Sequence, residues 1–393
     1  MSLRDSIDLI RYVRPRDLLD VWKLPAAMLA APFYRRIHPD LWIVSEDAYE
    51  ARDNGYWFYK YLRERHPEQD CVYAIKKRSP DYPKIAVLGE TVEFGSLRHW
   101  ILYLASSIQI SSQKSGDPNA AVFYFLQVYG LLKNKRLFLQ HGVIINDLPW
   151  LYYRSTKISR FLCGAQPEYE YVSRRFGYPE GNVRYTGLCR FDGLHDFNTD
   201  PKLILIMPSW RNYLVLRRDK LRRLEGEREL SETEYFMKWR QFLTDDALRM
   251  IAETYHVRFA FYPHRNMQPW LSLFPSDLDH VEICSRETYD VQALLKRAAL
   301  LVTDYSSVFI DMVYMKKPIV FYQFDYENFR RGQYAEGYFD YADNPFGESC
   351  RDKERLFTLI RGSIESGYKV SEDYAAAHAR FFPLYDRENC ARL

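Results

Sequence analysis

The stretch "LLVTDYSSVFIDMVYMKKPIVFY", residues 300–322, joins three local patterns in one short segment. Two apolar runs, 300–305 and 318–323, have the length and the β-branched content of buried strands. The residues between them, 306–317, predict a helix, and the turn 303–307 that leads into it is polar. A strand, a helix and a second strand in this order predict a βαβ unit with both strands parallel in one sheet.

The same alternation of apolar runs and helical patterns continues along the chain, which predicts an α/β fold with parallel sheets. The polar segment 194–201 ends in proline and the pattern then restarts, so we expect a linker between two Rossmann-like domains. The predicted strands are 41–46, 71–77, 84–89, 108–112, 136–142, 160–165, 183–187, 202–210, 257–264, 281–285, 300–305 and 318–323. The predicted helices are 48–65, 96–107, 167–176, 231–255, 290–299, 306–317, 351–364 and 371–381. The predicted domains are an N-terminal segment 1–37, a first Rossmann-like domain 38–195, a second one 196–370, and a C-terminal helix 371–393 for which packing on the first domain is one option.

The composition argues against several classes of protein. The 393 residues carry a formal net charge of only +3, which argues against a dedicated nucleic-acid binder. The six cysteines form no CxxC pair and no Cys/His cluster with zinc spacing, so we expect no metal site of that kind. The longest apolar run, 24–33, is too short for the roughly twenty residues that a spanning helix needs.

The N-terminal residues 1–37 mix apolar and basic side chains, a composition typical of segments that lie on a membrane surface. A helical layer packed on the first domain explains the same composition, and both interpretations stay open. The basic run 217–223 is most simply a solvated face, although it also suits contact with anionic lipid or a polyanionic product.

Polar and basic side chains follow four of the predicted strands. Ligands bind beyond the carboxyl ends of the strands in open parallel sheets, so these positions are the candidate site. The four groups are Gln140–Gly142, Pro208–Arg211, Pro263–Arg265 and Thr303–Ser307. The chain contains neither GxGxxG nor GxxxxGK[ST], which disfavours a classical dinucleotide enzyme and a P-loop kinase.

Two hydroxyls, Ser306 and Ser307, stand at the start of the predicted helix 306–317. The first N–H groups of a helix lack partners within the helix and carry the positive end of its dipole, so the hydroxyls predict an anion site suited to phosphate. The alternative is a plain helix cap by Asp304 or Ser306, which would contribute about 1 kcal/mol without any ligand.

Two histidines occupy strand ends. His141 precedes a glycine, and because imidazole titrates near neutral pH it suits a base that removes a proton from an attacking hydroxyl. His264 is followed by Arg265, and a donor beside a permanent cation suits a pyrophosphate, as does Arg211 after its own strand. A hydrogen-bonded structural histidine and an exposed arginine are the alternatives.

The segment 46–62 predicts a helix entry with a polar start at Asp53 and Asn54 and an aromatic face after it. In the first domain of a two-domain transferase this start would border the acceptor. A polar turn over an aromatic core face explains it equally well.

Taken together, the four strand-end groups resemble the CDP-glycerol glycerophosphotransferase family, which includes teichoic acid primases and polymerases and related capsule enzymes. The most specific part is Thr-Asp-Tyr-Ser-Ser with Asp311 in the following helix and then Lys-Pro-Ile, and the likeness extends over roughly 40 to 385. The resemblance implies a GT-B type fold with an interdomain cleft. It also implies transfer of glycerol phosphate or ribitol phosphate from CDP-glycerol or CDP-ribitol to a lipid-linked saccharide or polymer acceptor, with release of CMP.

The resemblance also assigns roles to residues. It implies His141 and His264 as catalytic residues, no cofactor, no metal, and a peripheral enzyme at an anionic membrane surface on the cytoplasmic face. The expected donor-binding residues are Ser209, Arg211, Arg265, Thr303, Asp304, Ser306, Ser307 and Asp311. The expected acceptor-binding residues are Asp53, Asn54, Asn146 and Asp147.

One motif departs from the family pattern, which typically reads His-Gly-Thr-Pro where this chain has His141-Gly142-Val143-Ile144. Because the threonine hydroxyl and the proline of that pattern are missing, the motif does not identify the acceptor. A GT-B glycosyltransferase or epimerase that uses a nucleotide sugar is the alternative enzyme, and a non-catalytic lipid- or polymer-binding protein is the alternative from another class.

Overall fold

The computed structural model describes residues 18–114, 116–132, 134–214, 229–275 and 277–393. These residues form two compact units. The first unit lies within Met1–Val143, Leu148–Asp192 and Asp386–Leu393, and the second comprises Ile144–Asp147 and the described part of Gly193–Tyr385. Residues 1–17 of the N-terminal segment and the basic run 217–223 lie outside the described residues.

In the described part of the first unit, seven parallel strands form one sheet in the order β3-β2-β1-β4-β5-β7-β8. The chain moves outward from β1 to β3 and then returns to the other side of β1, so the topological switch point lies between β1 and β4. The strands are β1 (Trp42–Ser45), β2 (Cys71–Ile75), β3 (Thr91–Glu93), β4 (Ile108–Ser111), β5 (Lys135–Phe138), β7 (Arg160–Cys163) and β8 (Val183–Tyr185).

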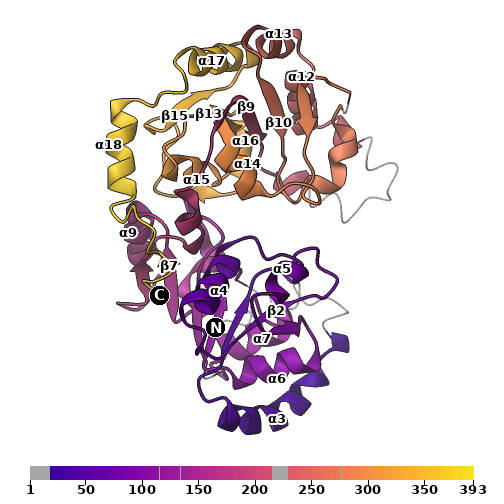
Figure 1. The fold of residues 1–393 in the computed structure, drawn as a ribbon, viewed down its shortest axis with the longest axis vertical. Helices are drawn as coiled ribbons and strands as arrows, with labels where there is room; N and C mark the ends of the chain where they lie inside the picture. The colour runs from indigo at the N-terminus through magenta and orange to yellow at the C-terminus, as the bar shows by residue number, and fades with distance from the viewer. Residues whose placement is uncertain (1–17, 115, 133, 215–228, 276) are drawn as a thin grey trace. The chain divides into compact units, whose positions relative to one another are not determined.

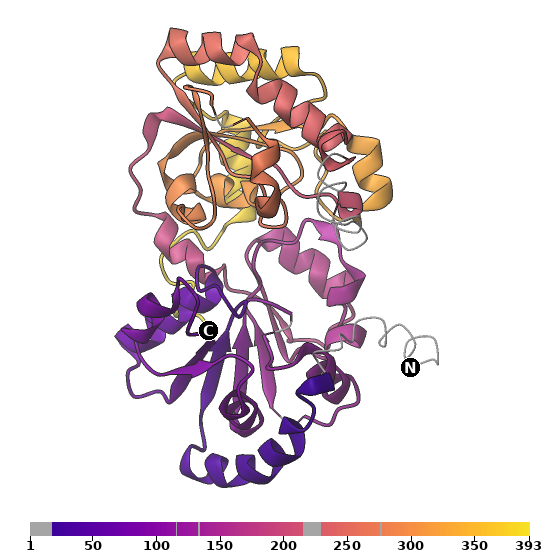
Figure 2. The same ribbon diagram turned by 90° about the vertical axis from the view of Figure 1, so that its right-hand side faces the viewer.

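Helices cover both faces of this sheet (Figure 2). Because side chains alternate along a strand, Val44 packs toward α4 and Ile43 toward α6 and α7. The helices of the first unit are α3 (Lys23–Ile37), α4 (Asn54–Arg65), α5 (Tyr82–Ala86), α6 (Leu97–Ala105), α7 (Ala120–Val128), η1 (Pro149–Leu151), α8 (Tyr153–Thr156) and α9 (Gln166–Arg175). A further short helix, η2 (Cys189–Leu194), lies where the chain passes from the first unit to the second.

In the described part of the second unit, six parallel strands have the order β11-β10-β9-β12-β13-β15, with the switch point between β9 and β12. The strands are β9 (Asp200–Met207), β10 (Arg258–Phe261), β11 (Val281–Ile283), β12 (Ala298–Thr303), β13 (Ile319–Tyr322) and β15 (Gly347–Cys350). A separate two-stranded ladder pairs β6 (Asn146–Asp147) with β14 (Ala335–Glu336) in antiparallel fashion.

An aromatic core fills the space between one face of the second sheet and the helices α12, α13 and α17 (Figure 1). Trp239 is fully buried there against Tyr322 and Phe261. The helices of this unit are α12 (Glu234–Leu243), α13 (Asp246–Tyr255), η3 (Gln268–Leu273), α14 (Val291–Arg297), α15 (Phe309–Tyr314), α16 (Tyr326–Gly332), α17 (Lys353–Glu365) and α18 (Glu372–Phe381). Two Rossmann-like units with parallel sheets confirm the predicted fold class.

Several predicted elements differ from the structure, and three of them have a clear local reason. The segment 84–89 is no strand: Pro83 stands in the first turn of α5, where proline favours a helix, and the edge strand β3 follows it. The predicted helix 231–255 is two helices, because Asp245 ends α12 and caps α13 through a hydrogen bond from the Ala247 amide to its carboxylate. The predicted helix 306–317 contains only the six residues of α15, since Lys316 adopts a left-handed φ of 57°.

The N-terminal helix α3 packs on α6 through two small residues, Ala27 and Ala31, which are both buried. The Arg35 side chain donates to the carbonyl oxygen of Ala105 at 3.0 Å, at the carboxyl end of α6. Large apolar side chains occupy its outer surface. Among the described residues, no helix combines the length and the apolarity needed to cross a membrane.

Candidate functional site

Three neighbouring strand ends in the second unit carry polar groups at the switch point of its sheet. The groups are Pro208–Arg211 after β9, Pro263–Arg265 after β10 and Thr303–Ser307 at the end of β12. Two hydrogen bonds link the ends of β9 and β12: the Ser209 amide donates to Asp304 Oδ1 at 2.7 Å, and Thr303 Oγ1 donates to the Met207 carbonyl at 2.7 Å. The structure therefore gathers these three predicted groups at one edge of one sheet.

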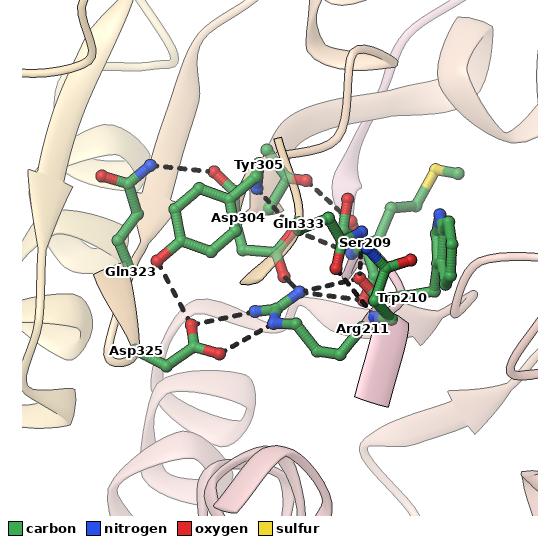
Figure 3. A network of polar contacts seen from close by, with 11 residues as sticks. Ser209, Trp210, Arg211, Asp304, Tyr305, Gln323, Asp325 and Gln333 are labelled. Atoms are coloured by element: carbon green, nitrogen blue, oxygen red, sulfur yellow. Dashed lines mark hydrogen bonds and ion pairs between the residues drawn. The ribbon is translucent and has the colours of Figure 1, made fainter. Parts of the chain in front are cut away.

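Arg211 lies at the centre of this edge and is only 1% exposed. Its guanidinium binds both carboxylate oxygens of Asp325, from Nε at 2.7 Å and from Nη2 at 3.0 Å (Figure 3). Its Nη1 lies 2.9 Å from Asp304 Oδ2. Burial alone would lower the pKa of Arg211, but the two carboxylates outweigh it and hold the pKa above its ordinary value. The guanidinium charge is therefore neutralised within the protein.

Asp304 is fully buried, and burial raises the pKa of its carboxyl. The Arg211 guanidinium and the amides of Ser209 and Tyr305 oppose this shift. Asp304 Oδ1 accepts from both amides, and its Oδ2 lies beside the Arg211 guanidinium. Its function in the fold is to join the β9 and β12 loops.

Aromatic rings complete the surroundings of the guanidinium. Tyr305, Tyr235 and Phe329 have ring centroids 5.0, 5.2 and 5.3 Å from its central carbon, within the range of cation–π attraction. The Tyr305 hydroxyl also donates to Asp325 Oδ1 at 3.2 Å. These contacts fix the plane of the guanidinium and the turn that follows β12.

Two glutamines fix the backbone around the same network (Figure 3). Gln323 Nε2 donates to the Asp304 carbonyl at 3.2 Å, and Gln333 Nε2 donates to the Trp210 carbonyl at 3.0 Å. Gln333 Oε1 accepts from the Asn212 amide at 2.9 Å. Gln333, directly after α16, thus holds the loop after β9, and Gln323, directly after β13, holds the turn after β12.

Exposure divides the predicted donor residues, together with His264, which was predicted as catalytic, into two groups. The buried members are Ser209, Arg211, Thr303, Asp304 and Asp311. The partly or fully exposed members are His264, Arg265, Ser306 and Ser307. Only the second group has side-chain surface with which a ligand can make direct contact.

His264 presents its ring at this edge, stacked on Trp210 with a centroid distance of 6.0 Å and an interplanar angle of 29°. Its Nδ1 accepts a hydrogen bond from the Asn266 amide at 3.2 Å. In the neutral ring this contact assigns the proton to Nε2. An Nε2–H donor suits an anionic oxygen.

The turn between β12 and α15 differs from the helix cap by Asp304 that the sequence offered as an alternative. The helix begins at Phe309, and its N-cap residue, Val308, makes no side-chain cap hydrogen bond. The Asp304 carboxylate accepts instead from Ser209 and Tyr305. Just before the helix, Ser306 Oγ accepts from the Val308 amide at 3.5 Å. The plain-cap interpretation is therefore wrong for Asp304 and stays open for Ser306, and both serines precede the helix that was expected to start with them.

One hollow in the second unit borders this network at Asp325 but has the wrong charge for a diphosphate. Its lining includes the carboxylates of Glu229, Glu232 and Glu234 besides Asp325. Across the described residues, His, Cys, Asp and Glu side chains do not assemble into a group of three or more that could hold a metal ion.

In the first unit, the exposed residue His141 follows Gln140, whose φ of 61° is left-handed and unusual for a residue with a side chain. Asn54 Nδ2 donates to the Gln140 carbonyl at 2.7 Å, and Arg190 Nη1 donates to the His141 carbonyl at 3.0 Å. Gln140 Nε2 also donates to Glu168 Oε1 at 3.0 Å. The backbone that carries His141 is thus held from three sides.

The two predicted acceptor residues near α4 take part in this support. Asn54 is fully buried, and its Oδ1 accepts from the Arg190 amide at 3.0 Å. Asp53 retains a side-chain exposure of 22%, and its Oδ1 accepts from Arg190 Nη1 at 2.9 Å. Asn54 therefore contacts the loop that presents His141 directly, and Asp53 is linked to it through Arg190.

The other two predicted acceptor residues, Asn146 and Asp147, form β6 and cluster with the second unit. Each is only 8% exposed. Asn146 Oδ1 accepts from Arg330 Nη1 at 2.9 Å. A Cβ atom on Gly337 would lie 2.4 Å from the Ile145 carbonyl oxygen, so the close approach of the chain to β6 requires a glycine there.

The profile of the family described as CDP-Glycerol:Poly(glycerophosphate) glycerophosphotransferase matches residues 35–393. The chain belongs to this family. The Minor teichoic acid biosynthesis protein GgaB of Bacillus subtilis is 27% identical over 361 residues, which are 90% of this chain and 39% of that protein. The Teichoic acid poly(glycerol phosphate) polymerase of the same organism is 22% identical over 84% of this chain and 43% of its own length. The chain spans about two fifths of these relatives.

Solved structures show the fold of this glycerophosphotransferase family member. The Wall Teichoic Acid Polymerase TagF superposes with a TM-score of 0.66 at 15% identity, covering 99% of this chain and 95% of that one. A UDP-N-acetylglucosamine 2-epimerase from Listeria monocytogenes superposes with a TM-score of 0.52 at 11% identity, over 90% and 94% of the two chains. Both likenesses confirm the predicted GT-B type fold.

Sequence reasoning missed several residues of these networks, among them Asp325 and Arg190, and it also missed Glu46, whose carboxylate accepts hydrogen bonds from the amides of Arg52, Asp53 and Tyr56. Glu46 ends the predicted strand 41–46, and Asp325 follows the predicted strand 318–323, so both occupied strand ends that the same rule would have selected. Arg190 follows no predicted strand directly, and no local pattern identifies it. Its contacts with Asp53 and His141 depend on residues about 140 and 50 positions away in the chain.

Proposed function

We propose that this family member transfers glycerol phosphate, or ribitol phosphate, from a CDP-alditol to a hydroxyl of a lipid-linked acceptor in the synthesis of a teichoic acid or capsule-type polymer. The family match over residues 35–393 carries the proposal. The three strand-end groups at the switch point of the second sheet support it, since this is where parallel α/β sheets bind nucleotides.

In this proposal the second unit binds the CDP-alditol. The exposed members of its strand-end groups, His264, Arg265, Ser306 and Ser307, contact the diphosphate. The buried members Ser209, Arg211, Thr303, Asp304 and Asp311 hold the loops in place and make no direct contact with the donor. The burial of Arg211 between two carboxylates supports this division.

His141 is the general base in the proposed reaction. The acceptor hydroxyl oxygen forms a bond to the phosphorus that bears the alditol, and the bond from that phosphorus to the CMP oxygen breaks. The hydroxyl proton moves to the His141 imidazole, and CMP leaves with the electron pair of the broken bond. Phosphoryl transfer depends mainly on positioning and on stabilisation of the developing charge. His264 and Arg265 supply that stabilisation.

The proposal divides the acceptor-side residues into one that contacts the acceptor and three that shape its surroundings. Asp53 keeps exposed surface and is the one we expect to contact the acceptor. Asn54, Asn146 and Asp147 are buried, and we assign them to shaping the acceptor side rather than to touching the substrate. The residues after His141 depart from the family's usual motif, so which hydroxyl of the acceptor reacts has to be determined by experiment.

A lipid-linked acceptor requires a membrane surface, and helix α3 offers a face for it. Met28, Leu29, Phe33 and Ile37 are 59%, 74%, 69% and 74% exposed. Arg36 lies in the last turn of the same helix and is exposed. Exposed apolar residues beside basic ones suit the interface of an anionic bilayer, so we propose peripheral binding on the cytoplasmic face.

Mass spectrometry of the reaction products tests the proposal. The chain is incubated with CDP-glycerol or CDP-ribitol and a synthetic lipid-linked disaccharide. We expect release of CMP and an acceptor that gains one or more alditol phosphate units. Turnover of a UDP-sugar or CMP-sugar, with no reaction of either CDP-alditol, would support the glycosyltransferase or epimerase alternative. Vesicle binding without turnover of any nucleotide donor would support a non-catalytic binding protein.

A further inference from the structure

A buried carboxylate lies directly after β1, at the switch point of the first sheet. Glu46 is 2% exposed and accepts backbone hydrogen bonds from Arg52 at 2.9 Å, from Asp53 at 3.1 Å and from Tyr56 at 2.6 Å. A Cβ atom on Gly55 would lie 2.8 Å from Glu46 Cγ, so a glycine at that position makes room for the side chain. Glu46 therefore ties the segment before α4 to the end of β1.

Glu46 binds the amides of residues in the segment 52–56, and the same segment binds the backbone next to His141 through Asn54. Asn54, the first residue of α4, donates from Nδ2 to the carbonyls of Gln140 at 2.7 Å and Leu139 at 3.4 Å. Its Oδ1 accepts from the Arg190 amide at 3.0 Å. Glu46 and the His141 loop thus lie at opposite ends of one continuous set of hydrogen bonds.

Arg190 closes this set through its side chain. Its Nη1 donates to Asp53 Oδ1 at 2.9 Å and to the His141 carbonyl at 3.0 Å. The Asp53 amide is one of the three that donate to Glu46. One short path therefore runs from Glu46 through Asp53 and Arg190 to the residue that we propose as the base.

The His141 loop needs such support because Gln140 has a left-handed φ of 61°. A non-glycine residue in this region persists only where surrounding contacts hold it. The carbonyls of Leu139, Gln140 and His141 all accept hydrogen bonds from Asn54 or Arg190. Loosening either donor would let the backbone relax and move the His141 imidazole.

We propose that Glu46 is a positioning residue for His141. The inference rests on the proposed role of His141 as the general base. Glu46 is too deeply buried to touch a substrate, and it acts by fixing Asp53 and Asn54, which in turn fix the loop. Because a small misplacement of a reacting group is costly, loss of the carboxylate lowers turnover without weakening donor binding.

The test is Glu46→Gln, measured as kcat and KM for CDP-glycerol. Both carboxylate oxygens accept backbone N–H groups, and the amide nitrogen of glutamine cannot accept, so at least one of these bonds is lost. We expect kcat to fall about tenfold or more, with KM for the donor unchanged. The matched control is Asp117→Asn, a buried carboxylate of the same unit that lies outside this path, beside Arg136 and Lys114, and it should keep the normal kcat.

A double variant separates positioning from general damage to the fold. In the His141→Ala background, Glu46→Gln should cause no further loss of kcat, because the base that it positions is already gone. A normal kcat for Glu46→Gln, or a further tenfold loss in the His141→Ala background, would overturn the inference. If His141→Ala itself keeps normal turnover, the proposed function of His141 fails instead. If Glu46→Gln does not fold, Arg190→Lys, which removes the last link of the path, is measured in the same way.

Discussion

In each unit, polar loops follow the carboxyl ends of the strands, but different interactions hold these loops in place. At the switch point of the second sheet, the loops are joined by charge: Arg211 lies between Asp304 and Asp325 and is surrounded by aromatic rings. In the first unit, the loop that carries His141 is held mainly by hydrogen bonds to backbone groups, from Asn54 and Arg190. In the second unit, Arg211 and Asp304 are thus buried within the loops that they join, whereas Arg265 is exposed beside them.

This difference has an electrostatic reason. A guanidinium that already binds two carboxylates and is only 1% exposed has little remaining attraction for a phosphate. A general base needs a precise position more than a nearby charge, and hydrogen bonds to the backbone supply that position. Four predictions test the contrast, from the largest expected effect to the smallest.

Arg211→Ala should give the largest loss of stability. It leaves Asp304 and Asp325 buried without their cation, and removal of one partner of a buried ion pair costs about 3–5 kcal/mol. Urea denaturation measures the free energy of unfolding of the second unit. The control Arg265→Ala removes an exposed guanidinium and should change that free energy by no more than about 0.5 kcal/mol. Equal losses in the two variants would contradict the division into supporting and ligand-facing residues.

His141→Ala should leave folding intact and reduce turnover by roughly 10², the usual contribution of a general base. That loss corresponds to about 2.7 kcal/mol in the activation free energy. Steady-state kinetics with CDP-glycerol give kcat, and a binding measurement should show little change in donor affinity. His66→Ala, another exposed histidine of the first unit, serves as the control with normal turnover. Near-normal kcat in His141→Ala would remove it from the role of base.

Gly337→Ala should destabilise the second unit by about 1–3 kcal/mol, because the added methyl group collides with the backbone of Ile145 and Asn146. Thermal unfolding measures the effect. Gly332→Ala is the matched control, since a Cβ there meets nothing within 4 Å and alanine favours the helix α16. Similar stability of the two variants would mean that β6 is not held as tightly as its buried contacts indicate.

Leu29→Glu should weaken binding to anionic vesicles about tenfold, because burial of one leucine side chain is worth about 1.5–3 kcal/mol at most. Co-sedimentation with vesicles of phosphatidylglycerol and phosphatidylcholine measures the partition. Met250→Glu, on an exposed position of α13 in the second unit, is the control and should bind as before. Equal loss in both variants would indicate that no particular face of the first unit meets the bilayer.

Much of the fold could be predicted from local pattern alone. Strands such as 71–77 and helices such as 96–107 agree with the structure because their apolar period and flanking residues act over a few positions. The errors arose where a local signal competed with another: Pro83 turned an apolar run into a helix, and Asp245 divided a long helical pattern. Strand ends also indicated the candidate site, because parallel strands present their carboxyl ends at one edge.

The sequence by itself thus determined the α/β class, the two repeated sheet units and the short groups that follow the strands. Tertiary structure alone decided which members of those groups are buried. Arg211 and Arg265 stand in equivalent settings in the sequence, yet Asp325, more than one hundred positions from Arg211, encloses one guanidinium while the other stays exposed. Burial depends on contacts between residues distant in the chain, and no local spacing encodes them. The same reason hid Arg190, which contacts Asp53 and His141 from far away in the chain, whereas Glu46 stands at a strand end that the local rule could have selected.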